Sequence, residues 1–172
     1  MGKVAWLTGL SGSGKSTIAN RAKELLEGRG CRVLVLDGDE IRSRMNGALG
    51  FSPDDIRENN RRIVDLCRRS LGDYDVILVP VIAPFRDSRA HARAALGAAM
   101  LEVYVRASLH EVARRDTKGL YAGARSGELQ GVIGIAPEVP YEIPAAPDLV
   151  LDTEAFDAET CARELVKALV PA

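Results

Sequence analysis

The segment Gly9–Ser16, Gly-Leu-Ser-Gly-Ser-Gly-Lys-Ser, has the residue types and the spacing of a phosphate-binding loop, G-x-x-x-x-G-K-[ST]. Its glycines allow backbone N–H groups to converge on phosphate oxygens, and the helix that should follow adds a partial positive charge. In such a loop the lysine, here Lys15, reaches the β- and γ-phosphates, and the hydroxyl of Ser16 binds Mg²⁺. The segment therefore predicts a site for ATP with Mg²⁺ rather than a glycine-rich turn without a ligand.

Two carboxylates, Asp37 and Asp39, follow the apolar run Arg32–Leu36. If that run is a strand, both residues lie at the carboxyl edge where open α/β sheets bind their ligands. Carboxylates beside a metal–phosphate centre can order the water around Mg²⁺ and accept the proton of an attacking hydroxyl. The same residues also suit a turn in which Asp39 caps a helix that begins near Glu40, and the two roles are compatible.

The elements that must position these groups alternate along the chain. Short runs rich in valine, isoleucine and leucine are typical of strands buried on both faces of a parallel sheet, and segments of helical period lie between them. The expected strands are Val4–Thr8, Arg32–Leu36, Val76–Ile82, Leu101–Val105 and Leu149–Leu151. The expected helices are Lys15–Glu27, Pro53–Leu71, Asp87–Leu96, Leu109–Arg115 and Asp157–Leu169.

The second of these helices carries the clearest signals. A stripe at helical spacing runs through Asn60, Val64, Cys67 and Leu71. Ser52 before Pro53 suits a helix cap followed by proline in the first turn.

Strand–helix alternation over all 172 residues predicts one α/β domain, residues 1–172, with a mainly parallel sheet. Only the stretch 116–147 breaks the rhythm, with five glycines and four prolines. A connection this long inside a compact domain is typical of a working lid. Apolar residues such as Leu120 and Tyr121 favour an ordered lid over a disordered segment.

The composition excludes several other classes of protein. A net charge of −1 provides no global field for nucleic acid or an acidic membrane, and no apolar run approaches the ~20 residues of a membrane span. The start of the chain is too short before the glycine loop to be a signal peptide. Cys31, Cys67 and Cys161 lack metal-ligand spacing and suit a reducing compartment. We therefore expect a cytoplasmic protein with a small-molecule substrate.

A phosphate-binding loop alone is shared by kinases, GTPases and motor ATPases. The sequence has no Asn-Lys-x-Asp segment that would read guanine, and it leaves little room for a second domain that a motor would move. A lid excludes water, which would otherwise compete as the phosphoryl acceptor. These features predict an ATP-dependent kinase that acts on a small acceptor.

Beyond the loop, a series of motifs resembles those of the adenylylsulfate kinase family, in that family's order and at close to its spacing. The Lys-Gly-Leu-Tyr lid motif and the Asp-Gly-Asp turn are more specific than the phosphate loop. The series spans nearly the whole chain: Gly9–Thr17, Asp37–Arg42, Leu49–Ser52, Glu58-Asn59, Arg61-Arg62, Pro84–Arg86, Arg115–Tyr121 and Pro144–Leu149. The resemblance implies transfer of the γ-phosphoryl group of ATP to the 3′-hydroxyl of adenylyl sulfate, a step of sulfate assimilation. It also implies a five-stranded P-loop kinase sheet flanked by helices, commonly in a homodimer.

The resemblance assigns catalysis to Lys15, Asp39 and Arg115, with Arg115 facing the ATP phosphates from the base of the lid. Ser16 and Asp39 belong to the metal shell. The residues that bind the triphosphate are Gly12, Ser13, Gly14, Lys15, Ser16 and Thr17.

On the acceptor side, the resemblance implies that Arg42, Asn59 and Lys118 hold anionic groups while Phe51 stacks on the adenine. Several cations are physically reasonable, because an anionic acceptor must approach ATP. The remaining acceptor-site residues are Asp39, Glu40, Ile41, Arg57, Ile82, Ala83, Gly131 and Val132.

The sequence departs from the family pattern at three residues and in one loop. Ala83 stands where many bacterial members have a serine that can be phosphorylated, and Val132 replaces an aromatic that clamps the acceptor's adenine. Ile56 occupies the usual position of an acceptor-binding arginine, and the loop Ile135–Tyr141 is a few residues longer than usual.

Arg57 is a candidate replacement for the missing arginine. It lies four residues before Arg61, and two arginines at this helical spacing repel unless an anion or an acid lies between them. A solvated charged face, in which Glu58 pairs with Arg61, explains the same pattern equally well.

Two alternatives to adenylyl sulfate phosphorylation remain at this stage. Ile56 and Val132 favour a kinase of the same build that acts on another nucleotide or a small hydroxyl metabolite. The second alternative is a nucleotide-binding module without catalysis, against which the intact Lys15, Ser16 and Asp39 argue.

Overall fold

The structure, a computed structural model, describes residues 2–44 and 49–170. One five-stranded sheet forms its centre, in the order β2-β3-β1-β4-β5, and every neighbouring pair is parallel. The strands are β1 (Lys3–Thr8), β2 (Val33–Val35), β3 (Val76–Pro80), β4 (Met100–Arg106) and β5 (Leu149–Asp152). Each expected apolar run overlaps one of these strands, with ends that differ by at most two residues, so the predicted α/β sheet is confirmed.

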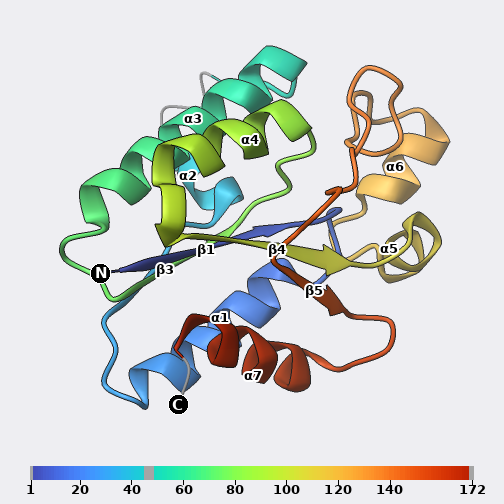
Figure 1. Cartoon of the computed structure of the whole chain (residues 1–172). Helices are drawn as coiled ribbons and strands as arrows, with labels where there is room; N and C mark the ends of the chain where they lie inside the picture. The colour runs from blue at the N-terminus through green and yellow to red at the C-terminus, as the bar shows by residue number, and fades with distance from the viewer. Residues whose placement is uncertain (1, 45–48, 171–172) are drawn as a thin grey trace.

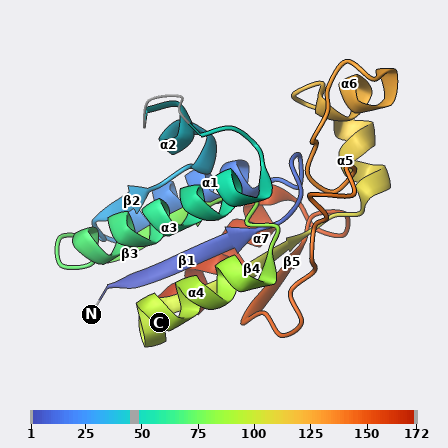
Figure 2. The same cartoon turned by 90° about the horizontal axis from the view of Figure 1, so that it is seen from above.

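Helices cover the sheet on both faces (Figure 1). One face carries α1 (Lys15–Glu27) and α7 (Ala158–Leu169), and the other carries α3 (Pro53–Ser70) and α4 (Arg86–Leu96). Helix α2 (Gly38–Arg44) packs against α3, and a 3₁₀ turn, η1 (Gly97–Ala99), leads from α4 into β4. Figure 2 shows α5 (Leu109–Arg115) and α6 (Leu120–Ser126) together beyond the ends of β4 and β5.

Strand β1 shows why the strands read as continuous apolar runs. Successive side chains of a strand point to opposite faces of a sheet. Ala5 and Leu7 are buried in the cluster with α1 and α7, while Val4 and Trp6 are buried in the cluster with α3 and α4. Because both faces are covered, no position along β1 from Val4 to Thr8 is left for a solvated side chain.

Helix α3 begins and packs as its sequence predicts. The hydroxyl of Ser52 accepts a hydrogen bond from the backbone N–H of Asp55 at 3.2 Å, and Pro53 is the first helical residue. Asn60, Val64 and Cys67, three members of the predicted stripe, are buried against the sheet.

The segment between α5 and β5 contains the helix α6 and an irregular return path across the end of the sheet (Figure 1).

The cap of α2 differs from the expected one. The helix begins at Gly38, and Asp37 rather than Asp39 caps it, since an Asp37 oxygen accepts the N–H of Asp39 at 2.9 Å. Within the described part of the chain, no helix has the length and apolar character that crossing a membrane requires.

Candidate active site

The phosphate-binding loop joins β1 to α1 at the carboxyl edge of the sheet. Gly12 and Gly14 have φ angles of 80° and 100°, which side chains with a Cβ rarely adopt. The side chain of Lys15 folds back over the loop. Its Nζ donates to the carbonyl oxygens of Gly9 at 2.9 Å and Leu10 at 2.8 Å. The loop therefore holds the ammonium group at its centre.

Burial lowers the pKa of Lys15 to about 7, because an ammonium group removed from water loses hydration that its charged form needs. The carboxylates of Asp39 and Asp37 act against this shift, and the ammonium of Lys118 adds to it. A phosphate group in the loop would favour the charged form again. The protonation state of Lys15 should therefore depend on whether a phosphate group is bound in the loop.

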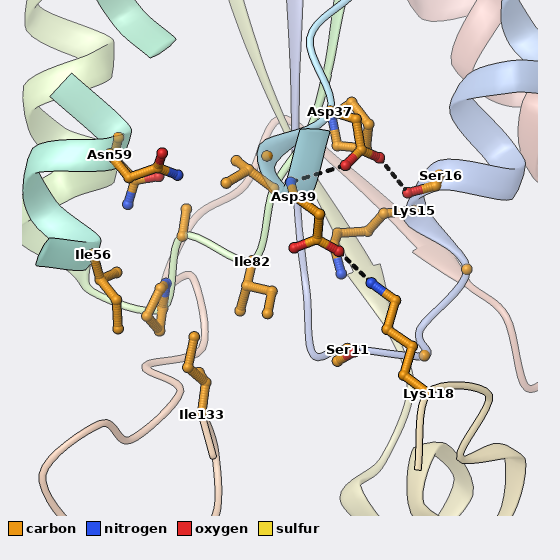
Figure 3. Close-up of a pocket in the computed structure, with 18 of the residues that line it drawn as sticks. Ser11, Lys15, Ser16, Asp37, Asp39, Ile56, Asn59, Ile82, Lys118 and Ile133 are labelled. Carbon is orange, nitrogen blue, oxygen red and sulfur yellow. Dashed lines mark hydrogen bonds and ion pairs between the residues drawn. The ribbon is translucent and has the colours of Figure 1, made fainter. Parts of the chain in front are cut away.

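Ser16 and the two carboxylates after β2 form one polar cluster (Figure 3). The hydroxyl of Ser16 donates to an oxygen of Asp37 at 2.7 Å. Mg²⁺ is commonly bound through one or two carboxylates together with substrate phosphates and water. The donor set of Ser16, Asp37 and Asp39 therefore fits a magnesium ion that arrives with a nucleotide.

The connection between α5 and α6 reaches this cluster through Lys118, whose ammonium forms an ion pair with the carboxylate of Asp39. Both side chains are more than half exposed, so the pair lies in the mouth of the site rather than in the protein interior. Because exposed ion pairs contribute little to stability, an anionic ligand can compete for Lys118 at small cost.

A pocket of about 200 Å³ lies between the phosphate loop and α3. Figure 3 shows Lys15, Ser16 and Lys118 at one end, with Ile56 and Ile133 on the opposite side. Its lining includes these predicted site residues: Gly12, Gly14, Lys15, Ser16, Thr17, Asp39, Asn59, Ile82, Ala83 and Lys118. The fold thus brings together groups that lie up to about a hundred residues apart in the sequence.

Two amide side chains, Asn59 and Asn60, line the α3 side of the pocket. Both are buried, and the Oδ1 atom of each has no hydrogen-bond partner among the described residues. A buried amide oxygen without a partner is costly unless a ligand or water satisfies it. This geometry suits a residue that contacts a bound substrate.

Arg115 contacts the phosphate loop from α5. Its guanidinium donates to the carbonyl oxygen of Gly12 at 3.3 Å and to Thr153 at 2.8 Å and 3.1 Å, and Glu111 accepts from its Nε at 2.8 Å. These contacts put Arg115 beside the phosphate loop, outside the pocket lining and paired with Glu111, and its predicted role toward the ATP phosphates stays a prediction.

Other predicted residues lie outside the pocket lining. Arg42 stacks on the ring of Phe51, with its guanidinium carbon 4.6 Å from the ring centre, and Phe51 is 60% exposed. Arg57 lies in a surface groove between α3 and α4, where its Nε donates to Asp87 at 2.9 Å. The remaining residues outside the lining are Ser13, Glu40, Ile41, Gly131 and Val132.

The structure adds contacts to the phosphate loop that the sequence analysis did not predict. Tyr121 is buried, and its hydroxyl donates to the carbonyl oxygen of Ser11 at 2.7 Å, which ties α6 to the phosphate loop. Thr153, directly after β5, donates to the carbonyl oxygen of Ser13 at 2.9 Å. The position of Thr153 at a strand end was a usable signal. No signal in the sequence indicated that Tyr121 would bind Ser11, 110 residues away.

Comparison with known proteins gives concordant results. A family model described as adenylylsulphate kinase matches residues 1–152. A probable adenylyl-sulfate kinase of Bacillus subtilis (strain 168) is 45% identical over 165 residues, which make up 95% of this chain and 83% of that protein.

Solved structures agree with the sequence matches. The APS kinase of Mycobacterium tuberculosis in complex with AMPPNP and APS is similar with a TM-score of 0.92 and 40% sequence identity, over 98% of this chain and 97% of that chain. A hexameric APS kinase from Thiobacillus denitrificans is similar with a TM-score of 0.69 and 28% identity, over 98% of this chain and 29% of that chain.

Proposed function

The chain belongs to the adenylylsulfate kinase family, and we propose that its pocket transfers the γ-phosphoryl group of ATP to the 3′-hydroxyl of adenylyl sulfate. One observation carries the proposal: a single pocket holds the phosphate-loop residues Lys15 and Ser16 together with Asp39 and Lys118. A kinase needs this combination, because a triphosphate and an anionic acceptor must meet between cations, beside a carboxylate that takes up a proton.

On the nucleotide side, the glycines of the loop point backbone N–H groups at the phosphates, and Lys15 neutralises charge that develops between the β- and γ-phosphates. Arg115 lies against Gly12 and adds positive charge at the same end. Ser16, Asp37 and Asp39 would hold Mg²⁺, which would supply charge neutralisation at the phosphate oxygens.

On the acceptor side, Asp39 accepts the proton of the attacking hydroxyl. Its carboxylate is paired with Lys118, and an acceptor that attracts Lys118 to its own anionic groups leaves the Asp39 oxygens available to that hydroxyl. Ala83 has no hydroxyl that could carry a phosphoryl group, so we propose direct transfer between the two substrates.

The observation that favours another acceptor is the position of Ile56. It lines the pocket as a buried apolar residue, where the family pattern has an acceptor-binding arginine. A different nucleotide or a small hydroxyl metabolite is therefore the second candidate for the acceptor.

A coupled ADP-release assay tests the proposal with adenylyl sulfate, other nucleotides and polyols as acceptors, each with ATP and Mg²⁺. We expect turnover to depend on adenylyl sulfate, and we expect Asp39→Asn to reduce it at least about a hundredfold, the usual contribution of a general base. Asp73→Asn, the same substitution at an exposed residue outside the pocket lining, is the matched control and should retain activity. Faster turnover with another acceptor would contradict the assignment of adenylyl sulfate.

Assembly and location are also proposals. We propose a homodimer, as the family resemblance implies. One structural relative, the APS kinase from Thiobacillus denitrificans, is a hexamer, and sedimentation of the purified chain distinguishes a dimer from a larger assembly. We place the reaction in the cytoplasm, because Cys31, Cys67 and Cys161 are all free thiols, as a reducing compartment favours.

A further inference from the structure

The second half of the lid, residues 132–143, is here named the return segment. Its residue Val139 is completely buried and packs with Ile56 of α3 and with Phe85, which precedes α4. Ile133 and Ala136 are partly buried against the same cluster. The return segment therefore has a small apolar core of its own, and Ile56 is part of it.

Arg89 of α4 connects this segment to two other parts of the fold. It is 3% exposed, and each side of its guanidinium has a different partner. Nε pairs with Glu102 of β4 at 3.0 Å, Nη1 donates to the carbonyl oxygen of Ala83 at 2.7 Å, and Nη2 donates to the carbonyl oxygen of Glu142 at 2.6 Å. One buried cation thus joins the sheet, the loop after β3 and the return segment.

Further bonds link the return segment to the loop after β3. The backbone N–H of Glu142 donates to the carbonyl oxygen of Pro84 at 2.9 Å, and the Glu142 side chain accepts the N–H of Arg86 at 2.6 Å. The hydroxyl of Tyr141 lies 3.0 Å from that of Thr8, which donates to the carbonyl oxygen of Ile82 at 2.5 Å. These bonds all converge on residues 82–86.

The loop after β3 is held in an unfavourable backbone conformation. Ala83 has a φ of 43°, in the left-handed region that residues with a Cβ seldom occupy. Such a conformation persists only where the surroundings enforce it. The carbonyl oxygen of Ala83 accepts hydrogen bonds from Arg89 and from Thr8, so the buried network supplies that constraint.

The constrained residues form a wall of the substrate pocket. Ile82, Ala83 and Pro84 line it from the loop, and Ile133 lines it from the return segment. Figure 3 shows Ile82 and Ile133 facing the same space, apart from the Lys15 and Ser16 end. Arg89 is not part of the lining, so it acts on this wall only through the backbone that it binds.

We propose that Arg89 is a positioning residue for the acceptor half of the site. It holds the loop 82–84 and the return segment together, so that the apolar wall exists before the acceptor binds. The proposal rests on the proposed function in that this wall serves the acceptor rather than ATP. Lysine cannot replace arginine here, because one ammonium group cannot reach three partners in a fixed plane.

The test compares Arg89→Lys with wild type by steady-state kinetics, with ATP and adenylyl sulfate varied separately. A misplacement of about 1 Å can cost up to about a hundredfold, so we expect the KM for the acceptor to rise about tenfold or more while the KM for ATP stays within about twofold. Arg93→Met is the matched control. Arg93 lies one turn later on α4 and also faces Glu102, but its backbone partner is Met100, which is outside the wall.

Two further variants cover the case that Arg89→Lys fails to fold. Arg89→Met combined with Glu102→Gln removes both buried charges together. Tyr141→Phe removes only the hydroxyl link to Thr8 and keeps the ring. Both should show the same selective rise in the acceptor KM, smaller for Tyr141→Phe.

The outcomes separate this proposal from the proposed function. If wild type ignores adenylyl sulfate but phosphorylates another acceptor, the proposed function fails, and the KM comparison is made with that acceptor. Equal changes in both KM values in folded variants, or no change in either, would overturn the positioning role of Arg89.

Discussion

At the scale of single residues, backbone carbonyl oxygens of the phosphate loop surround the ammonium group of Lys15. The contacts of Lys15 with Gly9 and Leu10 satisfy its N–H groups but do not neutralise its charge. This explains how a buried lysine can have a pKa of about 7 and still serve an anionic substrate. The substrate supplies the negative charge that the loop lacks.

We therefore predict that nucleotide binding takes up a proton. At pH 8 most of the free protein should carry neutral Lys15, and phosphates in the loop should raise its pKa toward the ordinary value. Calorimetric titration with a non-hydrolysable ATP analogue and Mg²⁺, in buffers of different ionisation enthalpy, should show uptake of close to one proton at pH 8. The uptake should largely disappear at pH 6, where Lys15 is already charged.

Lys15→Arg is the matched control, because arginine keeps the positive charge but does not titrate in this range. Its proton uptake should be near zero at both pH values. Equal uptake by Lys15→Arg and wild type would assign the proton to another group.

The lowered pKa of Lys15 also determines how its contribution to stability depends on pH. Since the unfolded chain binds more protons between about pH 7 and 10.5, the contribution of Lys15 to stability rises with pH in that window.

At the scale of elements, Ile56 links helix α3 to the return segment. Its side chain is 3% exposed and packs under the return segment with Phe85 and Val139. An arginine at this position would need an anion or a carboxylate, and the cluster is apolar. This residue of α3 thus belongs to the apolar core beneath the return segment.

We predict that Ile56→Arg destabilises the protein instead of restoring an anion site. Burying an unpaired charge among apolar residues should cost roughly 3 kcal/mol or more. For a chain of this size that corresponds to a fall in Tm of roughly 6 °C or more. Ile56→Leu, which keeps volume and polarity, should cost less than about 1.5 kcal/mol. An unchanged Tm together with a lower acceptor KM in Ile56→Arg would contradict this prediction, because the arginine would then extend into the pocket and bind the acceptor.

The elements also show what sequence patterns can and cannot predict. Helices α1 and α5 have the predicted bounds, because glycine-rich or serine-capped starts and clear periodicity define them. Helices α2 and α6 have seven residues each and carry no apolar stripe, so their sequences read as a turn and as part of the lid. Asp37 rather than Asp39 caps α2, since helix starts are uncertain by a residue or two when several acids are adjacent.

The residues of the candidate site also differ in how far the sequence could predict them. Lys15 and Ser16 could be predicted, because strand, loop and helix are contiguous in the sequence. The place of Arg57 in a groove depends on Asp87, 30 residues away. The burial of Arg89 depends on Glu102 and Glu142, which are 13 and 53 residues away on other elements. No local pattern encodes such contacts, so spacing alone left the role of Arg57 open and did not single out Arg89.

At the scale of the whole molecule, the phosphate loop is bonded to most parts of the fold. Its backbone carbonyls accept from Tyr121 of the lid, from Arg115 of α5 and from Thr153 after β5. The hydroxyl of Ser16 reaches Asp37 after β2. A ligand that orders this loop therefore also restrains the contacts of the loop with α5, with α6 and with the segments that follow β2 and β5.

We predict that the chain unfolds in one transition that nucleotide binding shifts as a whole. At a free concentration of one hundred times the Kd, an ATP analogue with Mg²⁺ should add about 2.7 kcal/mol of stability. For a domain of this length this corresponds to a rise in Tm of roughly 5–10 °C. Scanning calorimetry and near-ultraviolet circular dichroism should give the same midpoint with and without the ligand, as two-state unfolding requires. Lys15→Ala, which removes the charge but not the loop, should keep the single transition and lose most of the shift. Two transitions, only one of which moves with nucleotide, would mean that residues 1–172 do not behave as one cooperative domain and that the contacts to the loop do not couple its parts.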